Sequence, residues 1–313
     1  MSDPPLAAPG AGTGRSGRVG LLVWRISGAA GPVLAVILAL LAIWYAATVW
    51  LNAQWVLDQA ARADRMAGFG DILRGTLNQE RPVLPAPHQV AAELWNTVAL
   101  QPVTSRRSLV WHAWVTLSAT LTGFGIGTVL GIALAIGIVH NRAMDMSVMP
   151  WAIASQTIPI LAIAPMIIVV LNSVGVQGLL PKAIISAYLS FFPVVVGMVT
   201  GLRSPDAAQL DLMRTYSASR AQTLWKLRFP ASLPYLFASL KVGVAASLVG
   251  AIVGELPTGA VRGLGARLLS GSYYGQTVQI WAALLMAAFC AALLVGLIGL
   301  IQRLTLGRMG LAR

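Results

Sequence analysis

Six apolar runs dominate the sequence, and each is long enough to cross a bilayer as a helix, which takes about 20 residues. Hydrophobic residues make up 57 % of the chain and charged residues 10 %. So few charges are insufficient to cover that much apolar surface in water. The sequence therefore predicts an all-α polytopic membrane protein with six transmembrane helices, at about 31–51, 112–139, 149–173, 180–202, 236–256 and 278–301.

The polar segments outside these runs suggest how the chain is organised. The first 30 residues are rich in Gly, Pro, Ala and Ser, which is typical of a disordered tail. The predicted divisions are a cytoplasmic tail at 1–30, the first transmembrane helix and an external segment at 31–111, a core transmembrane domain at 112–303 and a cytoplasmic tail at 304–313.

The net charge of +12 constrains the orientation of the chain. Basic residues accumulate in the cytoplasmic loops of membrane proteins. One orientation places both termini and the basic loop at 203–234 inside the cell. A nucleic-acid partner is not expected, because the sequence has no basic patch with interleaved aromatic residues.

Residues that carry catalytic or metal chemistry are sparse. Cys290 is the single cysteine and lies in an apolar run, which excludes an intrachain disulfide and paired-cysteine chemistry. The three histidines lack metal-ligand spacing. No phosphate-binding Gly-x-x-x-x-Gly-Lys-Ser/Thr motif occurs. We therefore expect no catalytic residue, no metal and no cofactor in this chain.

The third apolar run carries one candidate for the wall of a pathway. Pro159 and Pro165 are predicted to bend it or to free backbone carbonyls near the middle of the membrane. Gln156, Thr157 and Asn172 add polar groups, which serve either a pathway or ordinary hydrogen bonding between helices. In the second run, Gly123, Gly127, Gly131 and Ala135 recur every four residues, as a packing seam or as a groove beside a pathway.

Glu255, at the end of the fifth run, is the other pathway candidate. An ionisable group in or near the bilayer is a functional candidate by default. Its structural alternative is to cap the backbone or to pair with Arg262 or Arg267. Its functional alternative is contact with a substrate or a partner protein.

The loop at 203–234 is the strongly polar insert in the apolar C-terminal half. Pro205 and Asp206 predict the start of a short helix. Ser217–Ser219 interrupts that helix, and a second amphipathic piece follows at 221–229, which Pro230 is expected to stop. Two short helices with a bend form a projecting elbow. It either docks a partner or lies among lipid headgroups with Trp225 as its anchor.

The spacing in this loop resembles the signature loop of bacterial ABC importer permeases. That signature is Glu-Ala-Ala, three residues, Gly, nine residues, Ile, one residue and Leu-Pro. The corresponding positions here hold Asp211-Leu212-Met213, Ser217, Leu227 and Phe229-Pro230. All landmarks keep their spacing, while the proline is the one identical residue.

The resemblance extends over about 80–303. PVLPAP at 82–87 is similar to the Leu-Pro-Ser-Pro element of sulfonate, taurine and nitrate importer permeases. Ile158-Pro159, GLR at 201–203 and VGE at 253–255 also fit that family. The fold that the resemblance implies is that of a type I ABC importer permease.

The resemblance implies a mechanism and a set of partners. Asp211, Leu212, Met213, Ser217, Ala218 and Ser219 would dock into a groove on a separate ATPase that binds ATP and Mg. Leu227, Phe229 and Pro230 would brace this contact against the membrane. The expected setting is a bacterial inner membrane, with a homodimer of permeases, a dimer of ATPases, an extracytoplasmic binding protein and membrane lipid. The implied solutes are sulfonates, taurine, nitrate or pyrimidine-type thiamin precursors.

One rival function is a secondary transporter with an interfacial cytoplasmic helix. Such proteins usually carry ionisable residues near the middle of the membrane and show inverted repeats. Charges within the apolar runs are nearly absent here, which favours an external source of energy. An intramembrane enzyme is not expected, because no nucleophile–base pair or His-Glu-x-x-His helix occurs.

Overall fold

The computed structural model describes residues 16–257 and 260–310, and within these ranges the chain forms helices and no strand. The prediction of an all-α protein is confirmed. The chain divides into two compact units, one ending at Pro87 and one beginning at His88. Residues 1–15 of the predicted tail lie outside the described residues, and helix α1 begins at Ser16, within the remainder of that tail.

The first unit consists of two helices and a proline-rich segment. Helix α1 (Ser16–Arg62) is followed by the short helix α2 (Phe69–Leu77). The fully buried Asn52 of α1 donates from Nδ2 to the Leu84 carbonyl at 2.9 Å and accepts from the Val83 amide at 2.7 Å. The Asn52 side chain thus pairs with backbone groups of residues 83 and 84 and holds this proline-rich segment against α1.

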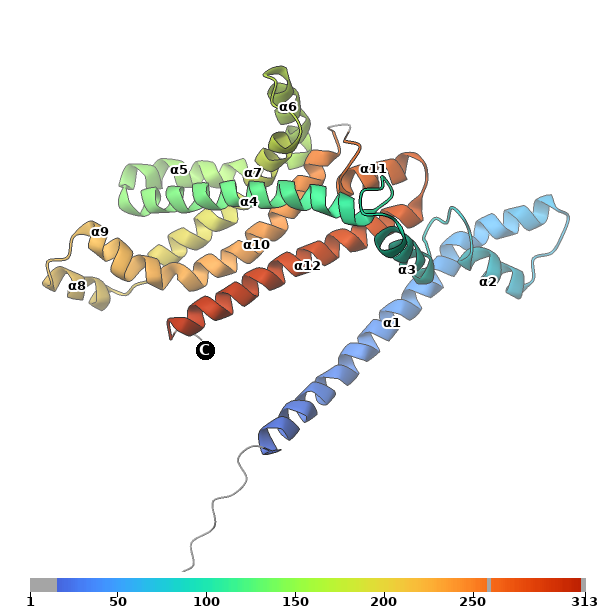
Figure 1. Cartoon of the computed structure of the whole chain (residues 1–313), viewed down its shortest axis with the longest axis horizontal. Helices are drawn as coiled ribbons and strands as arrows, with labels where there is room; N and C mark the ends of the chain where they lie inside the picture. The colour runs from blue at the N-terminus through green and yellow to red at the C-terminus, as the bar shows by residue number, and fades with distance from the viewer. Residues whose placement is uncertain (1–15, 258–259, 311–313) are drawn as a thin grey trace, which may run out of the picture. The chain divides into compact units, whose positions relative to one another are not determined.

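The second unit is a helical bundle (Figure 1). Helix α7 packs against α4 and α10, and α12 packs against α10. Helices α8 and α9 lie at one end of this bundle and α11 lies at the other. Its elements are α3 (Pro87–Trp95), η1 (Asn96–Leu100), α4 (Leu109–His140), α5 (Arg142–Ser155), α6 (Ile160–Ser173), α7 (Leu179–Leu202), α8 (Ala207–Thr215), α9 (Arg220–Thr223), η2 (Leu224–Arg228), α10 (Phe229–Glu255), α11 (Leu264–Tyr273) and α12 (Thr277–Arg308).

Among the described residues, five helical stretches are long and apolar enough to cross a membrane. They are Gly31–Arg62, Leu109–His140, Leu179–Leu202, Arg220–Glu255 and Thr277–Arg308. The pair α5 and α6 gives a sixth if it counts as one span. These stretches correspond to the six predicted runs, with ends that extend further than expected at the first, fifth and sixth.

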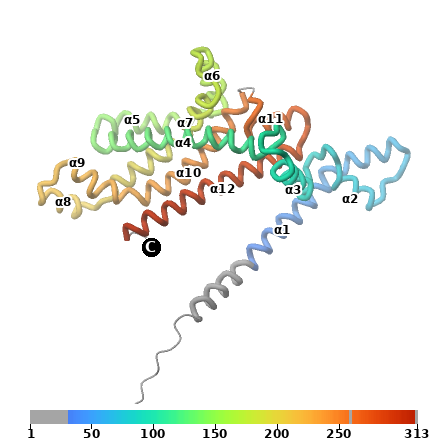
Figure 2. Tube along the Cα trace, viewed as in Figure 1, coloured from blue at the N-terminus to red at the C-terminus, as the bar shows by residue number. Residues whose placement is uncertain are grey.

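The third predicted span is not a straight helix. Helices α5 and α6 meet at an angle of 100° across a break at 156–159, and Figure 2 shows α6 turning away from the path of α5. Pro159 caps the start of α6 and has no N–H to continue the helix from α5. The expectation that proline bends this segment is confirmed, and the predicted third span corresponds to the bent pair α5 and α6.

The glycine stripe of α4 forms its packing seam with α7. Gly123, Gly127 and Gly131 are buried, and a Cβ at each would overlap Ser186, Ser190 and Val194 of α7, respectively. Small residues let two helices approach closely in lipid, where van der Waals contact drives their association. The packing interpretation of this stripe is therefore correct.

Candidate functional site

The elbow, defined as residues 203–228, begins with a fully capped helix. The Asp206 side chain accepts from the Gln209 amide at 2.8 Å, and the Gln209 side chain accepts from the Asp206 amide at 3.2 Å. This capping box satisfies two backbone donors that a helix start otherwise leaves unpaired. The predicted helix start at Pro205-Asp206 is confirmed at the position of Asp206.

The bend of the elbow is a helix C-terminus closed by two backbone hydrogen bonds. The Ser217 amide donates to the Arg214 carbonyl at 2.8 Å, and the Ala218 amide donates to the Met213 carbonyl at 2.9 Å. This pattern is a Schellman motif, which places the residue after the helix in the left-handed region. Ser217 has φ 52°, so it adopts a conformation that glycine adopts at lower cost.

A second cap restarts the helix directly after the bend. The Ser219 side chain accepts from the Gln222 amide at 3.2 Å, and the Gln222 side chain accepts from the Ser219 amide at 2.8 Å. Only Ser217 and Ala218 therefore separate the last cap of α8 from the first cap of α9. Because caps satisfy the backbone at both sides of the bend, its geometry is held by hydrogen bonds within the elbow.

Two side-chain contacts tie the base of the elbow to the bundle. Arg228 donates from Nη1 to the Leu202 carbonyl at 3.0 Å, which joins the end of α7 to the helix that leads into α10. Arg203 pairs with Asp145 of α5 at 2.8 Å. These contacts and the continuous helix from Arg220 to Glu255 connect the elbow to α5, α7 and α10.

The second half of the elbow differs from its prediction at Pro230. Helix α9 continues through a π-helical turn, η2, directly into α10, so that Arg220–Glu255 forms one helical stretch. Pro230 is the second residue of α10, directly after the π-helical turn, and it does not stop the helix. Leu227 lies in η2, and Phe229 begins α10 with its ring 5.2 Å from that of Trp225.

Helix α8 presents apolar side chains to its surroundings. Leu212 is 57 % exposed and Tyr216 is 77 % exposed, while Met213 and Ala218 are partly covered. Asp211 forms an exposed ion pair with Arg214 at 2.8 Å, a type of contact that contributes little to stability. Leu212 in α8 and Tyr216 directly after it are large exposed side chains suited to burial against a partner surface.

The pathway candidates are spread over three places. Gln156, Thr157 and Pro159 lie together at the break between α5 and α6, and Asn172 lies in the last turn of α6. A helix rises 1.5 Å per residue, which separates Asn172 from Pro159 by about 20 Å. Glu255 lies at the end of α10. The structure does not gather these residues into one site, and their role in a pathway stays a prediction.

Glu255 belongs to a buried polar cluster at the α11 end of the bundle. Its carboxylate accepts from Thr116 Oγ1 at 2.9 Å and from the Gly265 amide at 2.7 Å. The Thr116 hydroxyl oxygen in turn accepts from the Leu264 amide at 2.8 Å, and His112 Nδ1 lies 2.9 Å from the Gly263 amide nitrogen. These contacts cap the start of α11 and attach it to α4.

The two arginines considered as partners of Glu255 have other contacts. The Arg262 guanidinium lies over the Trp111 ring, 5.6 Å from its centroid. Arg267 Nη2 lies 3.9 Å from Glu93 Oε1 of α3. Burial raises the pKa of Glu93 and lowers the pKa of Arg267, while the charge of each partner opposes the effect of burial.

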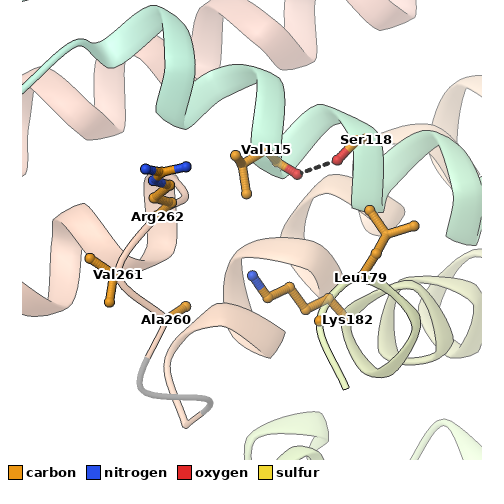
Figure 3. Close-up of a pocket in the computed structure, with 8 residues that line it drawn as sticks. Val115, Ser118, Leu179, Lys182, Ala260, Val261 and Arg262 are labelled. Carbon is orange, nitrogen blue, oxygen red and sulfur yellow. Dashed lines mark hydrogen bonds between the residues drawn. The ribbon is translucent and has the colours of Figure 1, made fainter. Parts of the chain in front are cut away.

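Sequence reasoning missed three residues at this end of the bundle. His112 and Thr116 are four residues apart on α4, a spacing that places two polar side chains on one helix face and was available as a signal. Lys182 is buried in the first turn of α7, and an ionisable residue within an apolar run is a functional candidate. Its side chain extends into a cavity of about 430 Å³ (Figure 3).

No group of three or more His, Cys, Asp or Glu that could hold a metal ion occurs in the described part of the chain. The polar clusters instead connect backbone groups of different helices. The elbow combines hydrogen-bonded helix caps with two large exposed side chains, Leu212 and Tyr216. We take it as the candidate site for coupling to a partner.

Comparison with known proteins places these features in a family. Residues 127–310 match the family described as "Binding-protein-dependent transport system inner membrane component". The riboflavin transport system permease protein RibX of Chloroflexus aurantiacus is 32 % identical over 71 % of this chain and 79 % of that protein. A probable ABC transporter permease protein of Haemophilus influenzae is 30 % identical over 65 % of this chain and 78 % of its own length. The formylaminopyrimidine transport permease protein ThiX of Halalkalibacterium halodurans is 31 % identical over 58 % of this chain and 68 % of that protein.

Proposed function

This chain belongs to the family of binding-protein-dependent transport system inner membrane components, and from this we propose that its elbow docks on a separate ATPase. The chain is a multi-pass membrane permease of an ABC importer. We propose four further properties: the contact with the ATPase, the orientation of the chain in the membrane, a homodimer of permeases and the class of the solute. In this proposal the elbow and both termini lie in the cytoplasm of a bacterial cell.

The observation that carries the proposal is the construction of the elbow. Capping boxes at Asp206 and Ser219 and the Schellman motif between them make α8 and α9 a rigid unit. The Arg228–Leu202 hydrogen bond transmits a displacement of this unit to α7 and α10. A coupling element needs this stiffness, because its two states must differ by defined contacts and not by loop disorder.

The docking contact is assigned to residues 211–219, with Leu212 and Tyr216 as its apolar part. Leu227, Phe229 and Pro230 support it from η2 and the start of α10. ATP and Mg would be bound by the partner ATPase, and a binding protein would deliver the solute on the other side of the membrane. The relatives transport different solutes by their names, riboflavin for one and formylaminopyrimidine for another. A small polar or anionic solute is the class that we propose here.

The rival interpretation of the elbow is an interfacial helix anchored by Trp225. The two interpretations differ in which exposed apolar residue matters, because Leu212 lies on α8 and Trp225 lies on η2. Trp225 is 59 % exposed, similar to Leu212, which makes the two residues a matched pair. Leu212→Glu is expected to abolish co-purification of the cognate ATPase, while Trp225→Glu retains most of it.

The experiment measures co-purification and ATP-driven solute uptake in membranes that express the complete transporter. Ser217→Trp provides a second test, because a bulky residue at the bend should also abolish ATPase binding. ATPase binding that survives both Leu212→Glu and Ser217→Trp would contradict the docking assignment. Uptake that continues without the ATPase and stops when the proton gradient collapses would support a secondary transporter instead.

A further inference from the structure

We propose that a pocket between the end of α4 and the elbow binds a phosphate group, with Arg214, Arg220 and Arg228 as its cationic contacts. The pocket has a volume of about 410 Å³, and its walls come from α4, from α8 and the bend, and from α9 with η2. It lies within the second unit, at the end of the bundle where Figure 1 shows α8 and α9.

Among the residues that the structure describes, three arginines and no carboxylate line this pocket. Arg220 begins α9, and its side chain makes no hydrogen bond or ion pair with any described residue. Arg214 pairs through Nη1 with Asp211 at 2.8 Å, and Arg228 uses Nη1 for the Leu202 carbonyl. A guanidinium carries several N–H donors, so these two arginines also keep donors for a ligand.

The arrangement of the arginines favours phosphate over a carboxylate. They come from three elements, α8, α9 and η2, and therefore approach the pocket from different backbone positions. A planar carboxylate matches one guanidinium fork, whereas the tetrahedral oxygens of phosphate accept from several directions. Like charges around one pocket also repel each other, and an anion placed between them removes that repulsion.

The pocket lies on a different face of α8 from the proposed docking residue Leu212. Leu210 and Arg214 are four residues apart on α8 and both line the pocket. A helix turns by about 100° per residue, so Leu212, two residues from each, lies on roughly the opposite face. A phosphate in the pocket therefore leaves Leu212 exposed for a partner.

Two sources of phosphate can reach this position. His140 lines the pocket and ends α4, one of the helices long and apolar enough to cross a membrane. The pocket is thus near the end of a span, where the headgroup of an anionic lipid or a dissolved phosphate can enter. A bound phosphate would join the elbow to α4 and stiffen it for coupling, and in this consequence the inference rests on the proposed function.

The test measures thermal unfolding of the purified full-length chain in neutral detergent at constant ionic strength. A ligand that binds the folded chain raises the unfolding midpoint with increasing concentration. The lipid arm titrates dioleoyl phosphatidylglycerol into the micelles, with zwitterionic dioleoyl phosphatidylcholine as its control. The soluble arm titrates inorganic phosphate, with chloride as its control. A saturable rise with phosphatidylglycerol alone assigns the phosphate to a lipid, and a saturable rise with inorganic phosphate shows that the free anion suffices.

Two variants connect the binding to the pocket. Arg220→Gln should weaken the apparent affinity about tenfold, because it removes a charge-assisted hydrogen bond to a phosphate oxygen. Arg220 is exposed and pairs with no described residue, so this substitution breaks no contact of the unliganded chain. Lys226→Gln removes one positive charge from an exposed position of the same elbow outside the pocket. It is the matched control and should leave the affinity nearly unchanged.

The absence of a saturable rise in both arms would overturn the inference. Equal weakening by Arg220→Gln and Lys226→Gln would also overturn it, because it would indicate a general attraction to a basic surface. The titration contains no ATPase, so a chain that binds no phosphate leaves the docking assignment intact. Conversely, ATPase that is retained by Leu212→Glu and Ser217→Trp contradicts the docking assignment and leaves the phosphate site untouched.

Discussion

Arg228 Nη1 donates a 3.0 Å hydrogen bond to the Leu202 carbonyl, across 26 residues of sequence. The bond closes the base of the elbow, because Leu202 ends α7 and Arg228 ends η2 just before α10. It satisfies a carbonyl at a helix C-terminus, where a positive charge is also favourable. The elbow is therefore attached to both helices that its movement would have to displace.

Replacing Arg228 with Met should uncouple the elbow from α7. The variant loses a hydrogen bond made by a charged donor, a contribution of about 2 kcal/mol, while it keeps most of the aliphatic stem. We expect ATPase co-purification to persist and ATP-driven uptake to fall about tenfold. Lys226→Met, an exposed position in the same turn, is the control and should retain uptake. Equal uptake in both variants would show that the tie is not needed for coupling.

Ser217→Gly should stabilise the protein. At φ 52° a non-glycine residue carries strain of about 1 kcal/mol that glycine does not. Ser217→Val should have the opposite effect, because a β-branched side chain is disfavoured in the left-handed region. Thermal unfolding in detergent measures both changes. If glycine and valine shift the unfolding midpoint in the same direction, the bend does not hold this conformation in solution.

Thr116→Val should destabilise the α11 end of the bundle. Valine has the shape of threonine but offers no group to Glu255 or to the Leu264 amide, and an unpaired buried polar group costs about 1–3 kcal/mol. Thr122→Val is the control on α4, since within the described residues the Thr122 hydroxyl donates to the Ser118 carbonyl of its own helix. The difference between the two unfolding midpoints isolates the contact between helices. A Thr116→Val protein no less stable than its control would contradict the assigned network.

Gly127→Leu should prevent correct packing, whereas Gly125→Leu should be tolerated. A Cβ at Gly127 meets the Ser190 side chain and the Ala187 carbonyl of α7, while a Cβ at Gly125 has no neighbour within 4 Å. The two glycines are about one helical half-turn apart and share the same helix propensity cost. Monodispersity after size-exclusion chromatography compares the two variants. If both variants are equally monodisperse, packing against α7 does not explain the glycine stripe.

Glu93→Gln should remove a pH dependence of stability. Burial raises the pKa of Glu93 in the folded chain above its ordinary value of 4.5. A carboxyl with a raised folded pKa contributes stability below its unfolded pKa, and this contribution is lost as pH rises through the folded pKa. The glutamine side chain of the E93Q variant cannot ionise, so wild type and variant should diverge as pH rises above about 4.5, with the variant relatively more stable. Parallel unfolding curves between about pH 4 and 8 would contradict this.

Local features of the elbow were predictable from the sequence, because they depend on neighbouring residues. The helix start at Asp206 and the interruption at Ser217–Ser219 follow from caps and prolines close in sequence. The continuation through Pro230 was not predictable in this way. A proline ends a helix or stands in the first turn of the next one, and the π-helical turn that decides between these outcomes has no sequence signature.

The position of the bend between α5 and α6 was predictable from the sequence, but its angle was not. Pro159 marks the place of the break in the sequence, but its angle of 100° depends on how both helices pack. The glycine stripe likewise offered a seam and a groove as alternatives. The structure favours the seam, because a Cβ added to these glycines would overlap with α7.

The sequence by itself determined the helical membrane class and the place of the elbow, because hydropathy and capping act over a few helical turns. The tertiary structure decided what Glu255 and Lys182 contact. Glu255 meets Thr116 across 139 residues, and Lys182 shares a cavity with Arg262 of a distant loop. Such contacts arise when α4, α7 and α10 pack together, and no spacing along the chain encodes them. Burial then turns each polar side chain into a group that must find a partner.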